Sequence, residues 1–211
     1  MITNTLLTTH IIAGITALLT GYTSLLSKKG SPIHVKSGRI YMWAMLLVVT
    51  TAFPISVLRP NPFLFCIAIF SGYLTYVGVR SVIQKSCFIK GVDYWVSGTM
   101  FATSILAYTT IFLLPYGQTL PEGFATISLV FASIACLLSS SELFLSKWVW
   151  GKSSYLEKHN SFINGALLST TTAVLVTLNA RLGLPNIVIW LGPTILVTPL
   201  IFYHNFKLKR R

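Results

Sequence analysis

Apolar segments alternate along this sequence with connections that are in turn basic and almost uncharged. Seven segments are long enough to cross a bilayer, since each is close to the ~20 residues that span ~30 Å of hydrocarbon at ~1.5 Å per residue. They cover approximately residues 5–27, 38–58, 62–83, 92–115, 123–146, 159–180 and 186–206. The sequence therefore predicts an all-α, polytopic integral membrane protein that forms a bundle of seven transmembrane helices.

Lysine and arginine are divided unequally between the two sets of connections. Fourteen of the sixteen fall in the first, third and fifth connections and in the C-terminal tail, whereas only Arg59 and Arg181 fall in the others. Short basic loops resist translocation, so the side of the membrane that holds them is the cytoplasm. We therefore expect the N-terminus to lie outside and the C-terminus to lie in the cytoplasm.

The composition excludes an ordinary soluble domain, because 54% of the residues are hydrophobic, only 9% are charged and the mean hydropathy is +0.73. Seven helices of ~20 residues leave only short connections in a chain of 211 residues. We therefore predict one transmembrane bundle over residues 1–206 and a basic cytoplasmic tail over residues 207–211.

A formal net charge of +12 would suggest nucleic acid as the partner of a soluble protein. Here the basic residues are spread over four cytoplasmic stretches, as the orientation requires, and no base-stacking motif accompanies them. The expected partners are the lipid bilayer and the anionic lipid head groups at its cytoplasmic face. Nucleic acid is not expected, and the sequence identifies no protein partner.

His10 lies in the first apolar segment, on one face with several small residues. At 100° per residue, Gly14, Ala17 and Gly21 fall within about 40° of His10 on the helix circumference. Such a stripe favours a close-packing seam in which His10 forms a hydrogen bond to a neighbouring helix. The alternative is that His10 binds a ligand or transfers protons.

His34, Glu142 and His159 come from three different segments and share one depth near the cytoplasmic face. Imidazoles and a carboxylate at one level could hold a transition metal, and two imidazoles on different helices could bind a haem iron axially. A substrate or proton pathway is a further alternative. The structural alternative is a network of hydrogen bonds and ion pairs with nearby basic residues, namely Lys36, Arg39, Lys152 and Lys158.

Two local signals concern helix geometry. Ser31 followed by Pro32 has the pattern of an N-cap and a proline in the first helical turn, so the helix of the second segment is expected to begin near Pro32. Gly192, Pro193 and Pro199 are expected to bend or break the last helix, because each proline removes a backbone hydrogen bond.

The sequence contains a set of motifs in a specific order and spacing, at residues 10–14, 17–21, 29–41, 159–166, 190–194 and 198–199. Together these motifs resemble the bacterial multi-pass membrane proteins of the domain-of-unknown-function 2306 family (DUF2306), and this resemblance covers nearly the whole chain. It implies that His10, Gly14, Gly21, Gly38, His159 and Pro193 are signature positions, and that the chain lies in a bacterial inner membrane. The sequence departs from the family pattern at Val35 and Phe162, where an arginine and a methionine are expected.

The family name implies no activity, and the residues leave three classes of function open. Zinc-protease, nucleophile-elbow, phosphate-loop and dinucleotide motifs are absent from the sequence, so no class of soluble enzyme is indicated. The first class is a scaffold or partner subunit in the membrane. The second is a haem- or metal-binding redox protein that uses His34 and His159, and the third is a transporter of a small solute or of protons.

Overall fold

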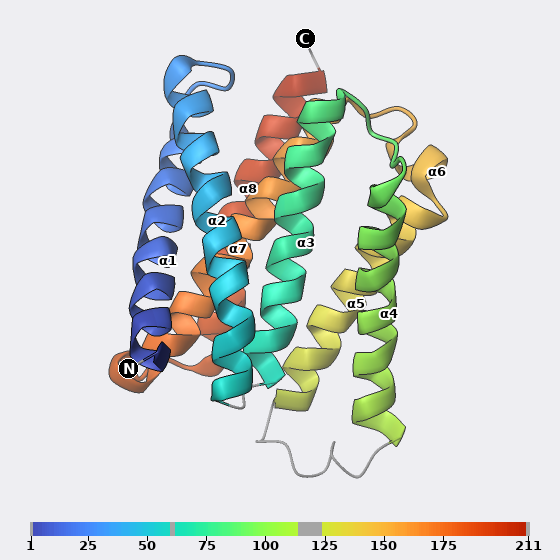
Figure 1. Cartoon of the computed structure of the whole chain (residues 1–211). Coiled ribbons are helices and arrows are strands. Elements are labelled where there is room, and N and C mark those ends of the chain that lie inside the picture. Colours follow the sequence, from blue (N-terminus) through green and yellow to red (C-terminus); the bar gives the residue numbers. More distant parts are fainter. Residues whose placement is uncertain (1, 60–61, 114–123, 210–211) are drawn as a thin grey trace. The chain divides into compact units, whose positions relative to one another are not determined.

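A computed structural model of the chain describes residues 2–59, 62–113 and 124–209 (Figure 1). All regular secondary structure in these residues is helical. The eight helices are α1 (Ile2–Leu26), α2 (Pro32–Leu58), α3 (Pro62–Gln84), α4 (Val92–Leu113), α5 (Phe124–Leu143), α6 (Ser146–Trp150), α7 (Tyr155–Leu182) and α8 (Asn186–Lys209).

Each of the seven predicted apolar segments corresponds to one of the long helices. The start of α2 is as predicted, because the Ser31 hydroxyl accepts a hydrogen bond from the backbone N–H of His34 at 3.3 Å and Pro32 lies in the first turn. The fifth segment is shorter than expected, since α5 ends at Leu143 and the short helix α6 follows. The expected turns at residues 59–62 and 115–123 fall wholly or partly outside the described residues.

Six of the long helices are long and apolar enough to cross a membrane, namely α1, α2, α3, α5, α7 and α8. Many of their large apolar side chains are exposed, including Ile12, Leu19 and Val57. Exposed apolar surface on long helices is what a lipid environment accommodates. The helices therefore indicate a membrane-embedded protein.

The helices group into two compact units, each of which is described by itself. Unit 1 comprises residues 1–83 and 156–211 and contains α1, α2, α3, α7 and α8. Unit 2 comprises residues 84–155 and contains α4, α5 and α6. A single bundle over residues 1–206 therefore stays a prediction. In unit 1, the start of α1 and the end of α8 lie at opposite ends (Figure 1).

Helix α7 forms polar contacts with each of the other helices of unit 1. Its middle turns contact three of them, through Thr171 to Tyr22 of α1 (3.0 Å), Thr170 to Met45 of α2 (3.3 Å) and Ser169 to Ser71 of α3 (2.7 Å). Near the start of α7, Asn160 donates to the side chain of Asn205 of α8 at 2.8 Å. Hydrogen bonds between helices replace the hydrophobic driving force that is absent in lipid.

An apolar cluster surrounds these contacts on the side of α1, α2 and α8. Its buried members are Ala17, Leu25, Tyr41, Ala44, Met45, Leu167 and Val197, with Ile163 and Ile201 packed against them. Tyr41 is only 2% exposed, and its hydroxyl forms no hydrogen bond within the described residues. Unit 1 thus has a mixed core in which apolar layers enclose individual polar groups.

The stripe of small residues predicted on the first helix packs closely at one end only. A Cβ atom at Gly21 would lie 2.7 Å from Leu167 Cδ1 and 2.9 Å from Tyr41 Cδ2, so α1 approaches α2 and α7 closely here. A Cβ at Gly14 would meet nothing within 4 Å. The expectation of a tight contact at Gly14 is therefore wrong, because α1 presents this position to open space. Gly38 is in ordinary contact range of Ser24.

Helix α8 is continuous through both of its prolines, so neither Pro193 nor Pro199 breaks it. Pro193 is buried, whereas Pro199 is exposed. Helix α2 likewise contains Pro54 within its length.

Unit 2 is held together by side-chain pairs that α4 forms with α5 and with Phe144, the residue that follows α5. The Phe101 and Phe144 rings form an edge-to-face contact with centroids 5.7 Å apart, and the Tyr108 hydroxyl bonds to Ser133 at 2.5 Å. Asp93, in the first turn of α4, accepts hydrogen bonds at 2.8 Å from the backbone N–H of Lys90 and from the Gln84 side chain. This carboxylate stabilises the helix start by satisfying a free N–H and by opposing the positive end of the helix dipole.

Candidate functional site

The residues predicted to carry chemistry gather mainly at one end of unit 1. Ser24 near the end of α1 contacts His34 at the start of α2, and Gly78 near the end of α3 contacts His159 at the start of α7. Asn205 near the end of α8 joins the same group through Asn160. We call this the basic end, because the adjoining residues include Lys28, Lys29, Lys36, Arg39, Arg80, Lys158 and Lys207.

His34 is fixed against the last turns of α1. Its Nδ1 atom lies 3.0 Å from the Ser24 carbonyl oxygen and 3.0 Å from the Ser24 hydroxyl. Because a carbonyl oxygen can only accept, Nδ1 carries the proton and donates it. The same ring is positioned from its own backbone by the Ser31 cap.

His159 is fixed in the same manner against α3. Its Nδ1 atom donates to the Gly78 carbonyl oxygen at 2.7 Å. Gly78 also permits the close approach that this bond requires, since a Cβ there would lie 2.9 Å from the backbone nitrogen of Ile163. The glycine thus supplies both the acceptor and the space for the histidine-bearing helix.

The two Nδ1 bonds leave each neutral ring with its lone pair on Nε2. Neither His34 nor His159 forms a hydrogen bond through Nε2 within the described residues. A backbone carbonyl on Nδ1 is the usual arrangement for an imidazole whose Nε2 binds a metal, since it fixes both the tautomer and the ring orientation. Both rings therefore have the protonation pattern of a ligand.

The histidines of the basic end lie close enough to interact electrostatically. His159 interacts with His34 and with Lys29. His204 of α8 interacts with His34, with Lys29 and with Lys207. Unlike the other two rings, His204 has a buried Nδ1 atom that forms no hydrogen bond within the described residues.

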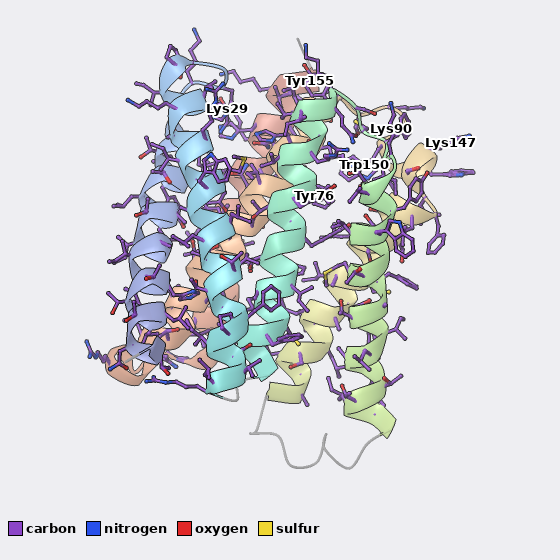
Figure 2. The ribbon with its side chains drawn as sticks, in the orientation of Figure 1. Lys29, Tyr76, Lys90, Lys147, Trp150 and Tyr155 are labelled. Atoms are coloured by element: carbon purple, nitrogen blue, oxygen red, sulfur yellow. The ribbon has the colours of Figure 1, made fainter. Side chains whose placement is uncertain are left out.

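Lys29 is half-buried and follows the end of α1 (Figure 2). Its ammonium donates hydrogen bonds to the carbonyl oxygens of Leu25 (2.9 Å) and Ser24 (3.4 Å), which belong to the last turns of α1. Burial lowers the pKa of Lys29 to about 8, because it removes water from the charged form. The bonds to α1 carbonyls are the expected interaction of a cation with the negative end of a helix dipole.

Glu142, the carboxylate of the predicted metal site, belongs to unit 2 and is 1% exposed near the end of α5. Its approach to His34 and His159 stays a prediction. Within the described residues of either unit, no three side chains of His, Cys, Asp and Glu form a group that could hold a metal ion. Of the basic residues expected in a structural network, Lys36 and Arg39 are exposed, whereas Lys158 is buried with its ammonium 5.9 Å from the Phe162 ring centre.

His10 lies at the opposite end of unit 1 from the other three histidines. Its Nδ1 atom lies 2.9 Å from the Thr51 hydroxyl and 3.2 Å from the Val48 carbonyl oxygen, both on α2. This bond between neighbouring helices is the one that the packing interpretation of His10 predicted.

Three features of the basic end were not expected from the sequence: Lys29 as a half-buried group, Gly78 as an acceptor, and the Asn160–Asn205 contact. The sequence does contain a pattern that predicts close packing at Gly78. Ser71, Thr75 and Gly78 form a stripe of small residues at helical spacing on α3. Asn160 and Asn205 could have been noticed as amides within apolar segments, where a polar group needs a partner.

Comparison of the chain with family models, with curated proteins and with solved structures gave no match. The resemblance to the DUF2306 family therefore stays a prediction.

Proposed function

We propose that the chain crosses the membrane seven times and that α4 is the seventh span. Unit 1 supports this topology, because the end of α3 and the start of α7 lie at the same end of it. The chain between them must therefore cross the membrane an even number of times. Since α5 is apolar enough to cross, α4 is expected to cross as well.

The basic end is proposed to face the cytoplasm of a bacterial cell, with the inner membrane as the location. Its lysines and arginines contrast with the other end of unit 1, where the sequence places only Arg59 and Arg181. The positive-inside rule supports this orientation. Anionic lipid head groups are then the expected neighbours of the basic end.

We propose further that unit 1 binds haem at the basic end, where the imidazoles of His34 and His159 would hold its iron. The observation that carries this proposal is the pair of Nδ1 bonds to Ser24 and Gly78, which leaves both Nε2 lone pairs available. The two rings lie on different helices and interact electrostatically. Two imidazoles are sufficient to hold a haem iron, whereas a structural zinc site takes four ligands.

The charge of the basic end also fits haem, which carries two propionate groups. Lys29 interacts electrostatically with His159, and cations near the ligands would neutralise the propionates. A bound haem would supply one-electron oxidation and reduction. The protein would fix the imidazole rings of His34 and His159, and its apolar cluster would exclude water. Its cations would position the two propionate groups.

Absorption spectroscopy of the protein purified from cells supplied with haem tests this proposal. We expect a Soret band that is lost in His34→Ala and in His159→Ala. His10→Ala is the matched control, because His10 has the same type of Nδ1 bond at the opposite end of unit 1 and should keep the band. A parent protein without a Soret band, or a band that survives both substitutions, would contradict the haem proposal.

The second candidate is a scaffold or partner subunit of the membrane. The observation that favours it is the set of hydrogen bonds from α7 to all four other helices of unit 1, which give a rigid bundle without requiring a cofactor. In that case His34 and His159 serve as links between helices, as His10 does. A folded protein without bound haem would favour this candidate.

A further inference from the structure

Unit 1 has an extreme imbalance of charge. Its sequence contains twelve lysines and arginines and a single acidic residue, Glu157. The basic end concentrates this charge, because only Arg59 and Arg181 of the twelve belong to the other end. Such a surface needs negative charge from outside the chain, because like charges at short range repel each other.

The hydrogen bonds of Lys29 fix the position of its ammonium group. Lys29 and His34 share the Ser24 carbonyl oxygen, at 3.4 Å and 3.0 Å, so the ammonium and the ring lie beside each other. Two of the three ammonium N–H groups are accounted for by the carbonyls of Ser24 and Leu25. Within the described residues Lys29 forms no ion pair, so its third N–H can donate to an anion.

Helix α8 brings a second cation and an unpaired ring to the same place. Leu25 of α1 and Ile201 of α8 pack in one apolar cluster, and His204 lies one turn beyond Ile201. The buried Nδ1 atom of His204 has no hydrogen-bond partner within the described residues. One turn further, the Lys207 ammonium lies 5.9 Å from the Tyr203 ring centre, which keeps it over this part of the helix.

We propose that Lys29, His204 and Lys207 form a binding site for the phosphate group of an acidic phospholipid. A phosphate offers several acceptor oxygens, and cations from different elements can bind it together. The half-buried ammonium of Lys29, which two carbonyl oxygens of α1 hold in place, distinguishes this site from exposed lysines that attract lipid by charge alone. The proposal depends on insertion in a membrane and does not depend on haem.

An acidic phospholipid is favoured over a free phosphate by the position of the site. The three residues lie at the ends of helices long and apolar enough to cross the bilayer, where lipid phosphates are concentrated. The exposed apolar side chains Phe202, Tyr203 and Phe206 on the same part of α8 can contact the acyl chains below a head group. Free phosphate would gain nothing from these side chains.

Native mass spectrometry of the full chain in mild detergent tests the site. The probes are dioleoylphosphatidylglycerol, dioleoylphosphatidylcholine and inorganic phosphate. We expect one phosphatidylglycerol to be retained preferentially, and Lys29→Met to weaken its retention about tenfold through loss of a charge-assisted hydrogen bond. The matched control is Lys28→Met, which removes the same charge from an exposed neighbour and should change retention less than about twofold.

Equal effects of Lys28→Met and Lys29→Met would overturn the proposal, because they would show attraction by charge alone. Equal retention of the two lipids would overturn it as well. Full displacement of the lipid by an equal concentration of inorganic phosphate would assign the site to a free anion and overturn the lipid assignment. A second variant, Lys29→Arg, keeps the charge and should retain the lipid, which separates loss of binding from loss of folding. None of these outcomes depends on a Soret band.

Discussion

Lys29 combines a positive charge with partial burial, and this combination gives stability a defined dependence on pH. The pKa of this side chain is lowered from 10.5 to about 8 in the folded protein. Between these two values the unfolded chain binds more protons than the folded chain, so the free energy of unfolding rises with pH. The ammonium therefore opposes folding at neutral pH.

We expect thermal stability of the purified protein to increase from about pH 8 to about pH 10.5, as the folded Lys29 loses its proton before the unfolded one. Other lysines and tyrosines titrate in part of this range, so the measurement compares melting curves of the parent with those of Lys29→Met. The variant should lack the part of the increase that Lys29 causes. Identical pH profiles for the two proteins would contradict the lowered pKa.

Gly21 and Gly14 give a matched test of packing at single residues. Gly21→Leu should destabilise unit 1 by about 1–3 kcal/mol, because the new side chain collides with Tyr41 and Leu167. Gly14→Leu enters open space and should be neutral or stabilising, since leucine favours a helix more than glycine does. Unfolding in detergent, followed by circular dichroism, measures both variants. Equal destabilisation by the two substitutions would contradict the close approach of α1 to Tyr41 and Leu167 at Gly21 alone.

For single residues, sequence periodicity predicted the stripe of small residues on α1. It did not predict which part of the stripe contacts α2 and α7. Periodicity places Gly14 and Gly21 on one face, whereas contact depends on where the axes of α1, α2 and α7 approach each other. The partner of His10 was predicted only as a neighbouring helix. That the neighbour is α2, through Thr51 and Val48, follows from the pairing of helices.

Helix α3 and helix α7 approach each other closely at Gly78, and a substitution there tests the packing of the two helices. Gly78→Ala would place a Cβ 2.9 Å from the backbone of Ile163, which cannot move without displacing α7. We expect a loss of stability of about 1–3 kcal/mol, in contrast to the gain that alanine usually brings to a helix.

The control for this pair is Gly98→Ala in α4, where a Cβ meets nothing within 4 Å. It should be neutral or slightly stabilising in the same unfolding experiment. If Gly78→Ala behaves as the control does, the close approach of α3 and α7 does not exist. In that case the bond between His159 and Gly78 also loses its support.

The helices themselves could be predicted because length and hydropathy dominate their formation in lipid. The start of α2 followed from Ser31 and Pro32, whose effects are local. The pairing of helices could not be predicted, because side chains on all faces of a membrane helix are apolar and carry little directional signal. The polar residues of α7 were the exception, but their partners on α1, α2, α3 and α8 lie far away in sequence.

For the whole molecule, the division into two units limits what the sequence could say about the site. Equal depth in the membrane suggested His34, Glu142 and His159 together. Depth contains no information about which helices are neighbours, and Glu142 belongs to unit 2. The pair His34 and His159 does lie within unit 1, where the two rings interact.

Both proposed sites lie at the basic end, and both require that the chain crosses the membrane seven times with this end in the cytoplasm. Single cysteines at positions 90 and 118, which flank α4, test this directly in a chain whose three native cysteines are replaced by serine. A membrane-impermeant maleimide should modify Gln118→Cys in intact spheroplasts, and Lys90→Cys only after permeabilisation. Modification of both positions from the same side would show that α4 does not cross, and modification of Lys90→Cys alone from outside would reverse the orientation.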